Sequence, residues 1–135
     1  MSGEVFIDTN VLLYLLAQDP KKADTAESIL ADGGTISVQV LNEFASVAHR
    51  KFGMSYAEIR SVLFPIQELC TVVPVHSGTH ADALWLAERY QLNLWDALIL
   101  ASALDTDCAV LYTEDLQHGQ IVEDRLRIAN PFATA

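Results

Sequence analysis

Four acidic residues of this chain stand in apolar surroundings, where solvation alone does not explain a carboxylate. Two of them directly follow short apolar segments, and two lie near the starts of apolar helical segments. The four are Asp8, Glu43, Asp96 and Asp115. Carboxylates placed in this way can act as general acids or bases, or they can bind metal ions. These four residues are therefore the candidate catalytic group.

Each acid also has a structural explanation. Asp8 and Asp96 could cap the helices that follow them. Asp115 could form a turn, and Glu43 could be an ordinary acid at a helix surface. Their joint placement favours a functional explanation, because two acids follow strands and the other two lie near helix starts expected at the same end of the fold.

The segments that position these acids alternate between strand and helix. Short apolar runs predict strands at 4–7, 35–38, 70–75 and 109–113, and a less regular fifth near Arg127 and Ile128. Periodicity and capping residues predict helices at 11–18, from Pro20 to the glycines at 33–34, at 39–51, from Ser55 onward, at 79–92 and at 95–105. Pro74 predicts an edge position for the third strand, because proline cannot donate to the ladder.

This alternation predicts an α/β fold with a parallel sheet covered on both faces. We expect a single domain over residues 1–135, with three layers and a central parallel sheet of four to five strands flanked by helices. Ligands of such sheets bind at the carboxyl ends of the strands, beside the point where the strand order reverses. Asp8 and Asp115 are expected at that edge.

Clustered acids need a positive counterpart. Two carboxylates about 5 Å apart repel each other by roughly 3 kcal/mol at an effective dielectric constant of about 20. No lysine follows Lys51, and the later arginines lie outside the acid motifs. A divalent cation is the remaining neutraliser. Oxygen ligands without Cys or His favour Mg²⁺ or Mn²⁺ over Zn²⁺.

Composition and charge limit the class of protein. The chain has 135 residues, of which 51% are hydrophobic, and its net charge is −10. That charge disfavours broad binding to nucleic acid, so any nucleic-acid-binding role needs a basic patch, a metal ion or a basic partner. No uncharged run approaches the about 20 apolar residues of a membrane span. The N-terminal segment carries acids where a secretion signal carries basic residues, which predicts a cytoplasmic protein. The two cysteines, Cys70 and Cys108, are isolated from each other and are expected to be reduced thiols.

Five segments resemble the PIN domain family, in the family's order, and most closely the VapC-type ribonuclease toxins of bacterial toxin–antitoxin pairs. They are FIDTNVLLY (6–14), ISVQVLNEF (36–44), LNLWDALILASA (92–103), LYTEDLQHGQ (111–120) and IANPF (128–132). The first and third are the most specific. In the fourth, Glu114 adjoins Asp115, so the identity of the functional acid is open. The resemblance implies a fold with the first strand central in a parallel sheet.

The resemblance also implies a single-strand ribonuclease that uses one or two Mg²⁺ or Mn²⁺ ions. Asp8 and Asp96 would be the primary ligands, and Asp115 would complete a second metal position. Glu43 would bind metal through water or orient the attacking water. Small polar residues that support the site are expected at Thr9, Asn10, Ser37 and Thr113.

Partners follow from the same resemblance. It implies an RNA substrate, a homodimer, and a cognate antitoxin that lays a segment along or into the active-site groove. A basic side chain of the antitoxin could pair with the acids, and the −10 charge of this chain favours such a segment.

Basic and aromatic side chains outside the acid motifs are candidate RNA contacts. The basic ones, which could equally be solvated helix ends, are Lys21, Lys22, Arg50 and Lys51. Trp85 and Trp95 could stack on bases, although their helical spacing favours core packing or a dimer contact.

Two other functions compete with a ribonuclease. A phosphotransfer domain also carries acids after strands and binds Mg²⁺, but it needs a late lysine that this chain lacks. The sequence DTN at 8–10 also lacks the second acid of a D-x-D-x-T motif. A PIN-like module that binds without catalysis is disfavoured by the presence of all four acids. Mg²⁺-dependent cleavage of RNA separates these functions.

Overall fold

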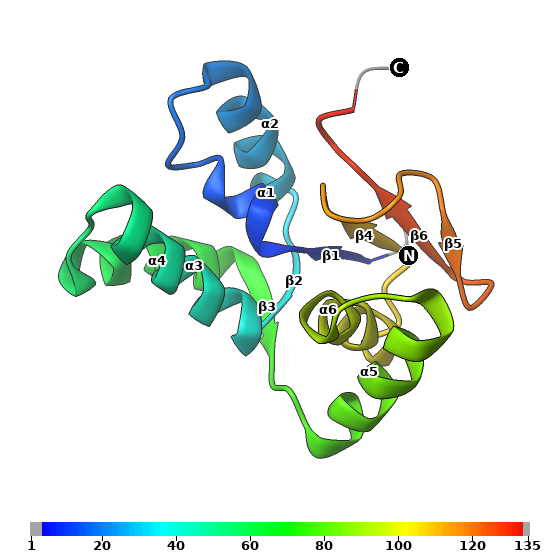
Figure 1. Ribbon diagram of the computed structural model, residues 1–135. Coiled ribbons are helices and arrows are strands. Elements are labelled where there is room, and N and C mark those ends of the chain that lie inside the picture. The colour runs from blue at the N-terminus through cyan, green and yellow to red at the C-terminus, as the bar shows by residue number, and fades with distance from the viewer. Residues whose placement is uncertain (1–3, 134–135) are drawn as a thin grey trace.

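A six-stranded sheet lies between two groups of helices in the computed structural model, which describes residues 4–133 (Figure 1). The spatial order of the strands is β3-β2-β1-β4-β6-β5. All pairs are parallel except β5 with β6. The strands are β1 (Val5–Ile7), β2 (Gly34–Ser37), β3 (Cys70–Val73), β4 (Val110–Tyr112), β5 (Ile121–Val122) and β6 (Leu126–Ala129).

The predicted parallel sheet with a central first strand is confirmed. The predicted edge position of the third strand is also confirmed, although β3 ends at Val73 and leaves Pro74 just outside the ladder. The short antiparallel β5 was not predicted, because two residues are too few to show an alternating pattern. The outermost residues of the predicted domain, 1–3 and 134–135, lie outside the described residues.

Capping residues begin or end three of the helices where the sequence predicts. Asp19 caps a helix with proline at its first position, and Ser55 with Glu58 forms the predicted capping box. Gly53 ends a helix with a left-handed φ of 65°, which glycine adopts without strain. The helices are α1 (Thr9–Leu13), α2 (Pro20–Ala31), α3 (Val38–Phe52), α4 (Tyr56–Leu69), α5 (Ser77–Tyr90) and α6 (Leu94–Asp105).

The first helix is shorter than predicted, since the expected helix over 11–18 ends at Leu13. Leu15 and Leu16 donate to the carbonyls of Leu12 and Leu13, at 3.0 Å each, so the chain continues in tight turns. Asp19 is extended, as a residue before proline usually is. A continuous helix could not reach that conformation, and the turns provide the transition into α2.

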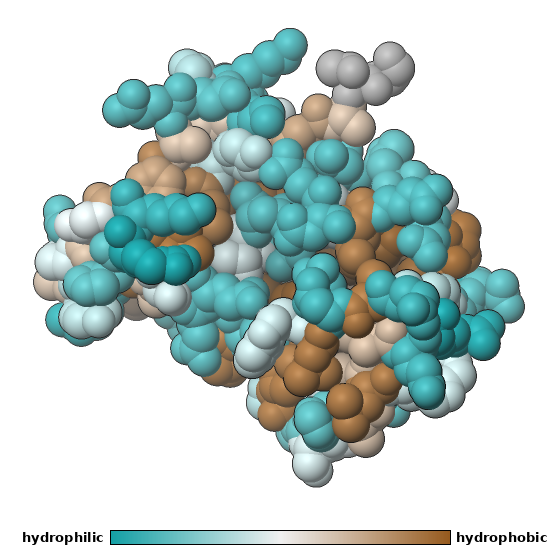
Figure 2. Space-filling model, in the orientation of Figure 1, coloured by the Kyte–Doolittle hydropathy of each residue, from teal (hydrophilic) through white to brown (hydrophobic). Residues whose placement is uncertain are grey.

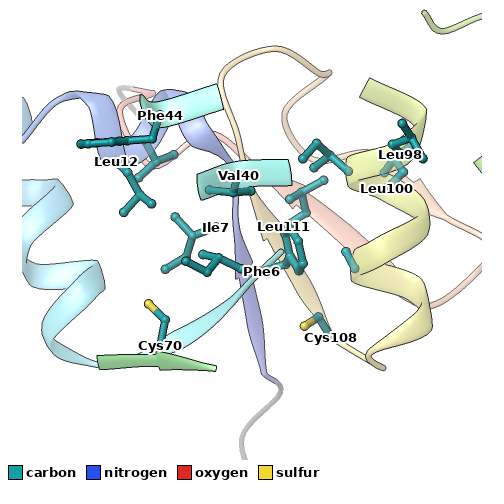
Figure 3. Packing of buried hydrophobic residues seen from close by; sticks show 14 of the residues in the cluster. Phe6, Ile7, Leu12, Val40, Phe44, Cys70, Leu98, Leu100, Cys108 and Leu111 are labelled. Atoms are coloured by element: carbon teal, nitrogen blue, oxygen red, sulfur yellow. The ribbon is translucent and has the colours of Figure 1, made fainter. Parts of the chain in front are cut away.

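Right-handed crossovers place α1–α4 on one face of the sheet and α5 and α6 on the other, because the strand order reverses at β1 (Figure 1). Figure 3 shows Leu12 and Phe44 packed on the first face and Leu98 and Leu100 on α6. Every residue of α6 from 97 to 104 is buried. No helix within residues 4–133 is long and apolar enough to cross a membrane.

Candidate active site

Asp8 is the first residue after β1, and its carboxylate also caps α1. Oδ1 accepts a hydrogen bond from the Thr9 backbone N–H at 2.7 Å, and Oδ2 accepts one from the Thr113 hydroxyl at 2.9 Å. Asp8 is only 5% exposed. Burial raises the pKa of Asp8 to about 7, although the bonds from Thr113 and Thr9 favour the charged form. No ion pair among residues 4–133 neutralises this carboxylate.

The Asn10 side chain joins the ends of β1 and β4. Its amide nitrogen lies 3.2 Å from Asp8 Oδ2, 3.1 Å from Thr113 Oγ1 and 3.0 Å from Asp115 Oδ2. Its carbonyl oxygen accepts the backbone N–H of Glu114 at 3.1 Å. Two amide hydrogens are thus shared among three acceptors. Asn10 gathers Asp8 and Asp115 around one donor group and adds no charge.

Glu43 reaches the same region from the second turn of α3. Its Oε1 accepts the Thr9 hydroxyl at 2.9 Å, and its Oε2 lies 3.4 Å from the amide nitrogen of Gln39. The same nitrogen donates to the carbonyl of Trp95 at 3.2 Å. Glu43 is half-buried.

Asp96 lies in the first turn of α6, but it does not cap the helix. Asn93 is the N-cap, and its side-chain oxygen accepts the Asp96 backbone N–H at 2.9 Å. The Asn93 amide then donates to Asp96 Oδ2 at 3.0 Å. Partial burial raises the pKa of Asp96, and repulsion from Asp115 and Glu43 adds to that shift. The idea that Asp96 is the cap is therefore wrong, and its carboxylate is available to the cleft.

One cleft of about 330 Å³ brings all four predicted acids together. We name it the acid cleft. It lies at the carboxyl ends of β1 and β4, where the strand order reverses, and parallel sheets bind ligands at this place. Its lining includes Asp8, Thr9, Asn10, Glu43, Arg50, Trp95, Asp96 and Asp115.

The donor set of the acid cleft fits a hard divalent cation. Its candidate ligands are carboxylate oxygens, and no His or Cys lines it. Arg50 is the one basic residue in its lining within the described chain. Asp8 repels Asp115 and Glu43, and Asp96 repels the same two residues. No three Asp, Glu, His or Cys side chains within residues 4–133 converge closely enough to form a ready-made ion site. A cation would therefore have to draw the acids together.

Glu114 belongs to a different group from Asp115, although the two are adjacent. Its carboxylate accepts the Tyr14 hydroxyl at 2.8 Å and lies 3.9 Å from the Lys22 ammonium. Lys22 also donates to the Tyr14 oxygen at 3.2 Å, and the Tyr14 ring packs edge-on against Phe132. We name Tyr14, Lys22, Glu114 and Phe132 the Tyr14 cluster. Glu114 is neutralised there, and Asp115 is the acid that lines the cleft.

The predicted supporting residues divide into two groups. Thr9, Asn10 and Thr113 contact the acids directly. Ser37 does not line the acid cleft; it is fully buried and caps α3 through the Val40 backbone N–H at 3.4 Å.

Only one of the four basic candidate RNA contacts lies in the acid cleft. Arg50 lines the acid cleft, whereas its neighbour Lys51 is exposed and does not. Lys21 is exposed on α2, and Lys22 is engaged in the Tyr14 cluster. Only Arg50 of the four therefore lies where a phosphate bound in the cleft could meet it.

Neither tryptophan is in the core, so of the two predicted roles core packing is wrong, and a dimer contact stays a prediction. Trp85 is 51% exposed and Trp95 is 63% exposed. Trp85 lies on α5 beneath the Arg89 guanidinium, next to exposed Leu84. Figure 2 shows apolar surface over the α5 region, beside a mainly hydrophilic centre. Trp95 lines the acid cleft.

Three contributing residues were missed at the sequence level. Asn93 has a recognisable signal, since it stands three residues before Asp96, at capping-box spacing. Gln39 stands one helical turn before Glu43, but the pair needs the structure to be recognised. Tyr14 has no local signal, because its partner Glu114 is 100 positions away.

Comparison with known proteins gives similarity over nearly the whole chain. The family model of the PIN domain matches residues 5–123. A toxin–antitoxin complex from Klebsiella pneumoniae covers 97% of this chain and 100% of its own, with a TM-score of 0.73 and 18% identity. The VapC20 toxin of Mycobacterium tuberculosis, which cleaves the sarcin–ricin loop, covers 83% of this chain and 90% of its own, with a TM-score of 0.65 and 20% identity.

A third similar structure is VapBC2 from Rickettsia felis bound to a DNA fragment of its promoter. It covers 93% of this chain and 98% of its own, with a TM-score of 0.65 and 17% identity. At such identities the structural likeness establishes the fold. No curated protein sequence matches the chain.

Proposed function

The chain belongs to the PIN domain family, and we propose that it is a metal-dependent endoribonuclease that cleaves RNA phosphodiester bonds as the toxin of a toxin–antitoxin pair. The observation that carries this proposal is the convergence of four carboxylates on one cleft at the reversal point of the sheet. The four are Asp8, Glu43, Asp96 and Asp115.

The chemistry of the donor set supports Mg²⁺ or Mn²⁺ as the cofactor. A divalent cation at such a site lowers the pKa of water and offsets the negative charge that develops during phosphodiester hydrolysis. In the proposal, Asp8 and Asp96 hold the cation and Asp115 adds a further ligand. Burial makes a charged Asp8 costly, so a cation gives it the neutralisation that the described residues lack.

The remaining residues of the acid cleft orient and transfer protons. Thr113 and Asn10 fix the plane of the Asp8 carboxylate through their hydrogen bonds. Thr9 and Gln39 hold the two oxygens of Glu43. Glu43 accepts the proton of an attacking water, and Arg50 binds an RNA phosphate at the rim of the cleft. A cation together with Arg50 lets a chain with a net charge of −10 accept a polyanion.

Cleavage of a labelled single-stranded RNA by the purified protein tests this function. We expect cleavage in Mg²⁺ or Mn²⁺, no cleavage in excess EDTA, and recovery when the cation is returned. A PIN-like module without catalysis would bind the RNA in every condition and never cut it. Cleavage that persists at full rate in EDTA would contradict the metal dependence.

An antitoxin partner and a homodimer complete the proposal, with RNA in the cytoplasm as the target. The similar Klebsiella and Rickettsia structures are toxin–antitoxin complexes, which motivates a partner. A basic side chain from an antitoxin could pair with Asp8 and Asp96 and occupy the place of the cation. The exposed apolar side chains of α4 and α5 offer surface for protein contacts: Tyr56, Phe64, Leu84 and Trp85.

Expression in bacteria tests the partner. Expression of the chain alone should arrest growth, and co-expression of an antitoxin encoded beside its gene, once identified, should restore growth. The same chain carrying Asp96→Asn should not arrest growth. Harmless expression of a form that cleaves RNA, together with a monomer in light scattering, would contradict both the antitoxin and the homodimer.

A further inference from the structure

A second groove adjoins the acid cleft, and the two share Glu43 and Trp95. Its volume is about 480 Å³, within the range of about 300–1,000 Å³ typical of small-molecule sites. Its lining is mainly apolar and comes from the start of α3, the segment after β3, and the start of α6. The apolar residues are Val38, Pro74, Val75, Trp95 and Leu98.

Trp95 is the exposed aromatic surface at this junction. Its side chain is 63% exposed, and the next residue along the chain is the proposed ligand Asp96. The Gln39 amide binds both the Trp95 carbonyl at 3.2 Å and Glu43 Oε2 at 3.4 Å. The backbone that carries the indole is therefore tied to the acid cleft, while the ring itself faces solvent.

We propose that this groove binds an unpaired nucleobase of the RNA, with Trp95 as the stacking platform beside the scissile phosphate. The inference rests on the proposed ribonuclease function. A nucleobase is the flat, uncharged part of the substrate, and it matches an apolar groove that continues from a site for phosphate. Stacking of a base on an aromatic side chain tolerates any base identity. Because a base must leave its helix to enter, the groove selects single-stranded RNA.

Gln39 also lines this groove, and its amide nitrogen joins the groove to the acid cleft through Trp95 and Glu43. Its Oε1 atom has no hydrogen-bond partner among residues 4–133, but the atom is buried and does not face a base in the groove. The groove therefore offers a stacking surface rather than a hydrogen-bond acceptor.

Trp95 fluorescence tests this subsite directly. The chain has two tryptophans, so Trp85→Phe leaves Trp95 as the single reporter. We expect single-stranded RNA with non-hydrolysable phosphate links to quench that emission in Mg²⁺, and the matching duplex to quench it far less. Absence of quenching at RNA concentrations that saturate binding in a filter assay would overturn the proposal.

Cleavage by Trp95 variants gives a second readout. We expect Trp95→Ala to raise the KM for single-stranded RNA about tenfold, equivalent to about 1.4 kcal/mol and within the measured range for stacking. Trp95→Phe, which keeps an aromatic ring, should restore most of the loss. The matched control is Trp85→Ala, which removes a comparably exposed tryptophan remote from the cleft and should behave as wild type.

Failures of the two proposals are distinguishable. Quenching without cleavage in any cation would refute the ribonuclease and support the base subsite. Cleavage by Trp95→Ala at the wild-type KM would refute the subsite alone. A dimer that dissociates on Trp95→Ala, with no quenching by RNA, would assign the groove to a second copy of this chain and overturn the proposal.

Discussion

Two neighbouring regions of the molecule treat their carboxylates in opposite ways. In the Tyr14 cluster, Glu114 accepts a tyrosine hydroxyl and lies beside the ammonium of Lys22. In the acid cleft, the adjacent Asp115 shares one neutral amide with Asp8, and repulsion from Asp115 contributes to the raised pKa of Asp8. One region neutralises its acid internally, and the other holds its acids in place without neutralising them.

The difference separates a structural carboxylate from a functional one. Charges paired within the chain stabilise the fold to a modest extent and need no ligand. Carboxylates that are oriented by hydroxyl and amide donors but remain uncompensated store repulsion that a bound cation can relieve. The Tyr14 cluster therefore fixes the turn after β4, and the acid cleft next to it is prepared for a cation.

The largest effect expected from this comparison is the loss of cleavage on Asp96→Asn. The side chain keeps its size and its contact with Asn93 but loses its charge. We expect RNA cleavage to fall by more than the about 10–100-fold typical of losing a partner that only supports a metal ligand. Circular dichroism should show an unchanged fold. Wild-type cleavage by this variant would remove Asp96 from the mechanism.

Substitutions of the adjacent acids Asp115 and Glu114 should differ most clearly in their effect on the cleavage rate. We expect Asp115→Asn to reduce cleavage by about 10–100-fold. Glu114→Gln should cleave at close to the wild-type rate, because the Glu114 side chain bonds Tyr14 rather than lining the acid cleft. Single-turnover rates at saturating Mn²⁺ measure both variants. Equal losses in the two would show that the regions are not separate.

The buried charge of Asp8 predicts an unusual pH dependence of stability. Its pKa is about 7 in the folded chain against 3.8 for an aspartate in water, so the folded state binds more protons between these values. The free energy of unfolding should therefore fall as pH rises toward about 7 and then level off. Asp8→Asn should remove this pH dependence and raise the free energy of unfolding of the metal-free protein by about 2 kcal/mol at neutral pH.

Thermal melts in EDTA across this pH range measure the effect. The gain from Asp8→Asn should grow with pH and then become constant. Part of the gain is lost because an Asn amide cannot accept from Thr113 and Asn10 as freely as a carboxylate does. A gain that is the same at pH 5 as at pH 8 would contradict the assignment to Asp8.

The smallest effect is expected in the Tyr14 cluster. Tyr14→Phe keeps the ring contact with Phe132 but removes the hydroxyl that Glu114 accepts and that Lys22 binds. We expect a loss of about 1 kcal/mol in the free energy of unfolding, with cleavage close to wild type. A large loss of activity at unchanged stability would show that the Tyr14 cluster acts in catalysis.

The sequence predicts those features of the acid cleft that depend on local sequence pattern. Asp8 directly follows an apolar segment and Asp115 comes three residues after another, and the order of those segments implies a parallel sheet, so the meeting of the two acids at one edge is foreseeable. The N-cap role of Asn93 also follows from spacing, although capping by Asp96 was an equally simple interpretation. Helix length after Asp8 was overestimated, since turns at Leu15 and Leu16 depend on how the chain enters α2.

Contacts between side chains that are distant in the sequence could not be predicted from local pattern. Glu114 and Asp115 are adjacent acids, and only the fold brings Tyr14 and Lys22 to one of them. The exposure of Trp95 is likewise set by where the start of α6 lies against α3. Residue type and spacing identify the candidates, while tertiary contacts decide which carboxylate is neutralised.

Calorimetric titration of Mn²⁺ into the wild-type protein and Asp96→Asn at neutral pH tests the central claim most directly. We predict saturable binding to the wild type, loss of most of that binding in Asp96→Asn, and wild-type binding in Asp105→Asn, whose acid is solvated at the far end of α6. Absence of binding to the wild type, or equal binding to Asp96→Asn, would contradict the claim that the acid cleft is a divalent-cation site.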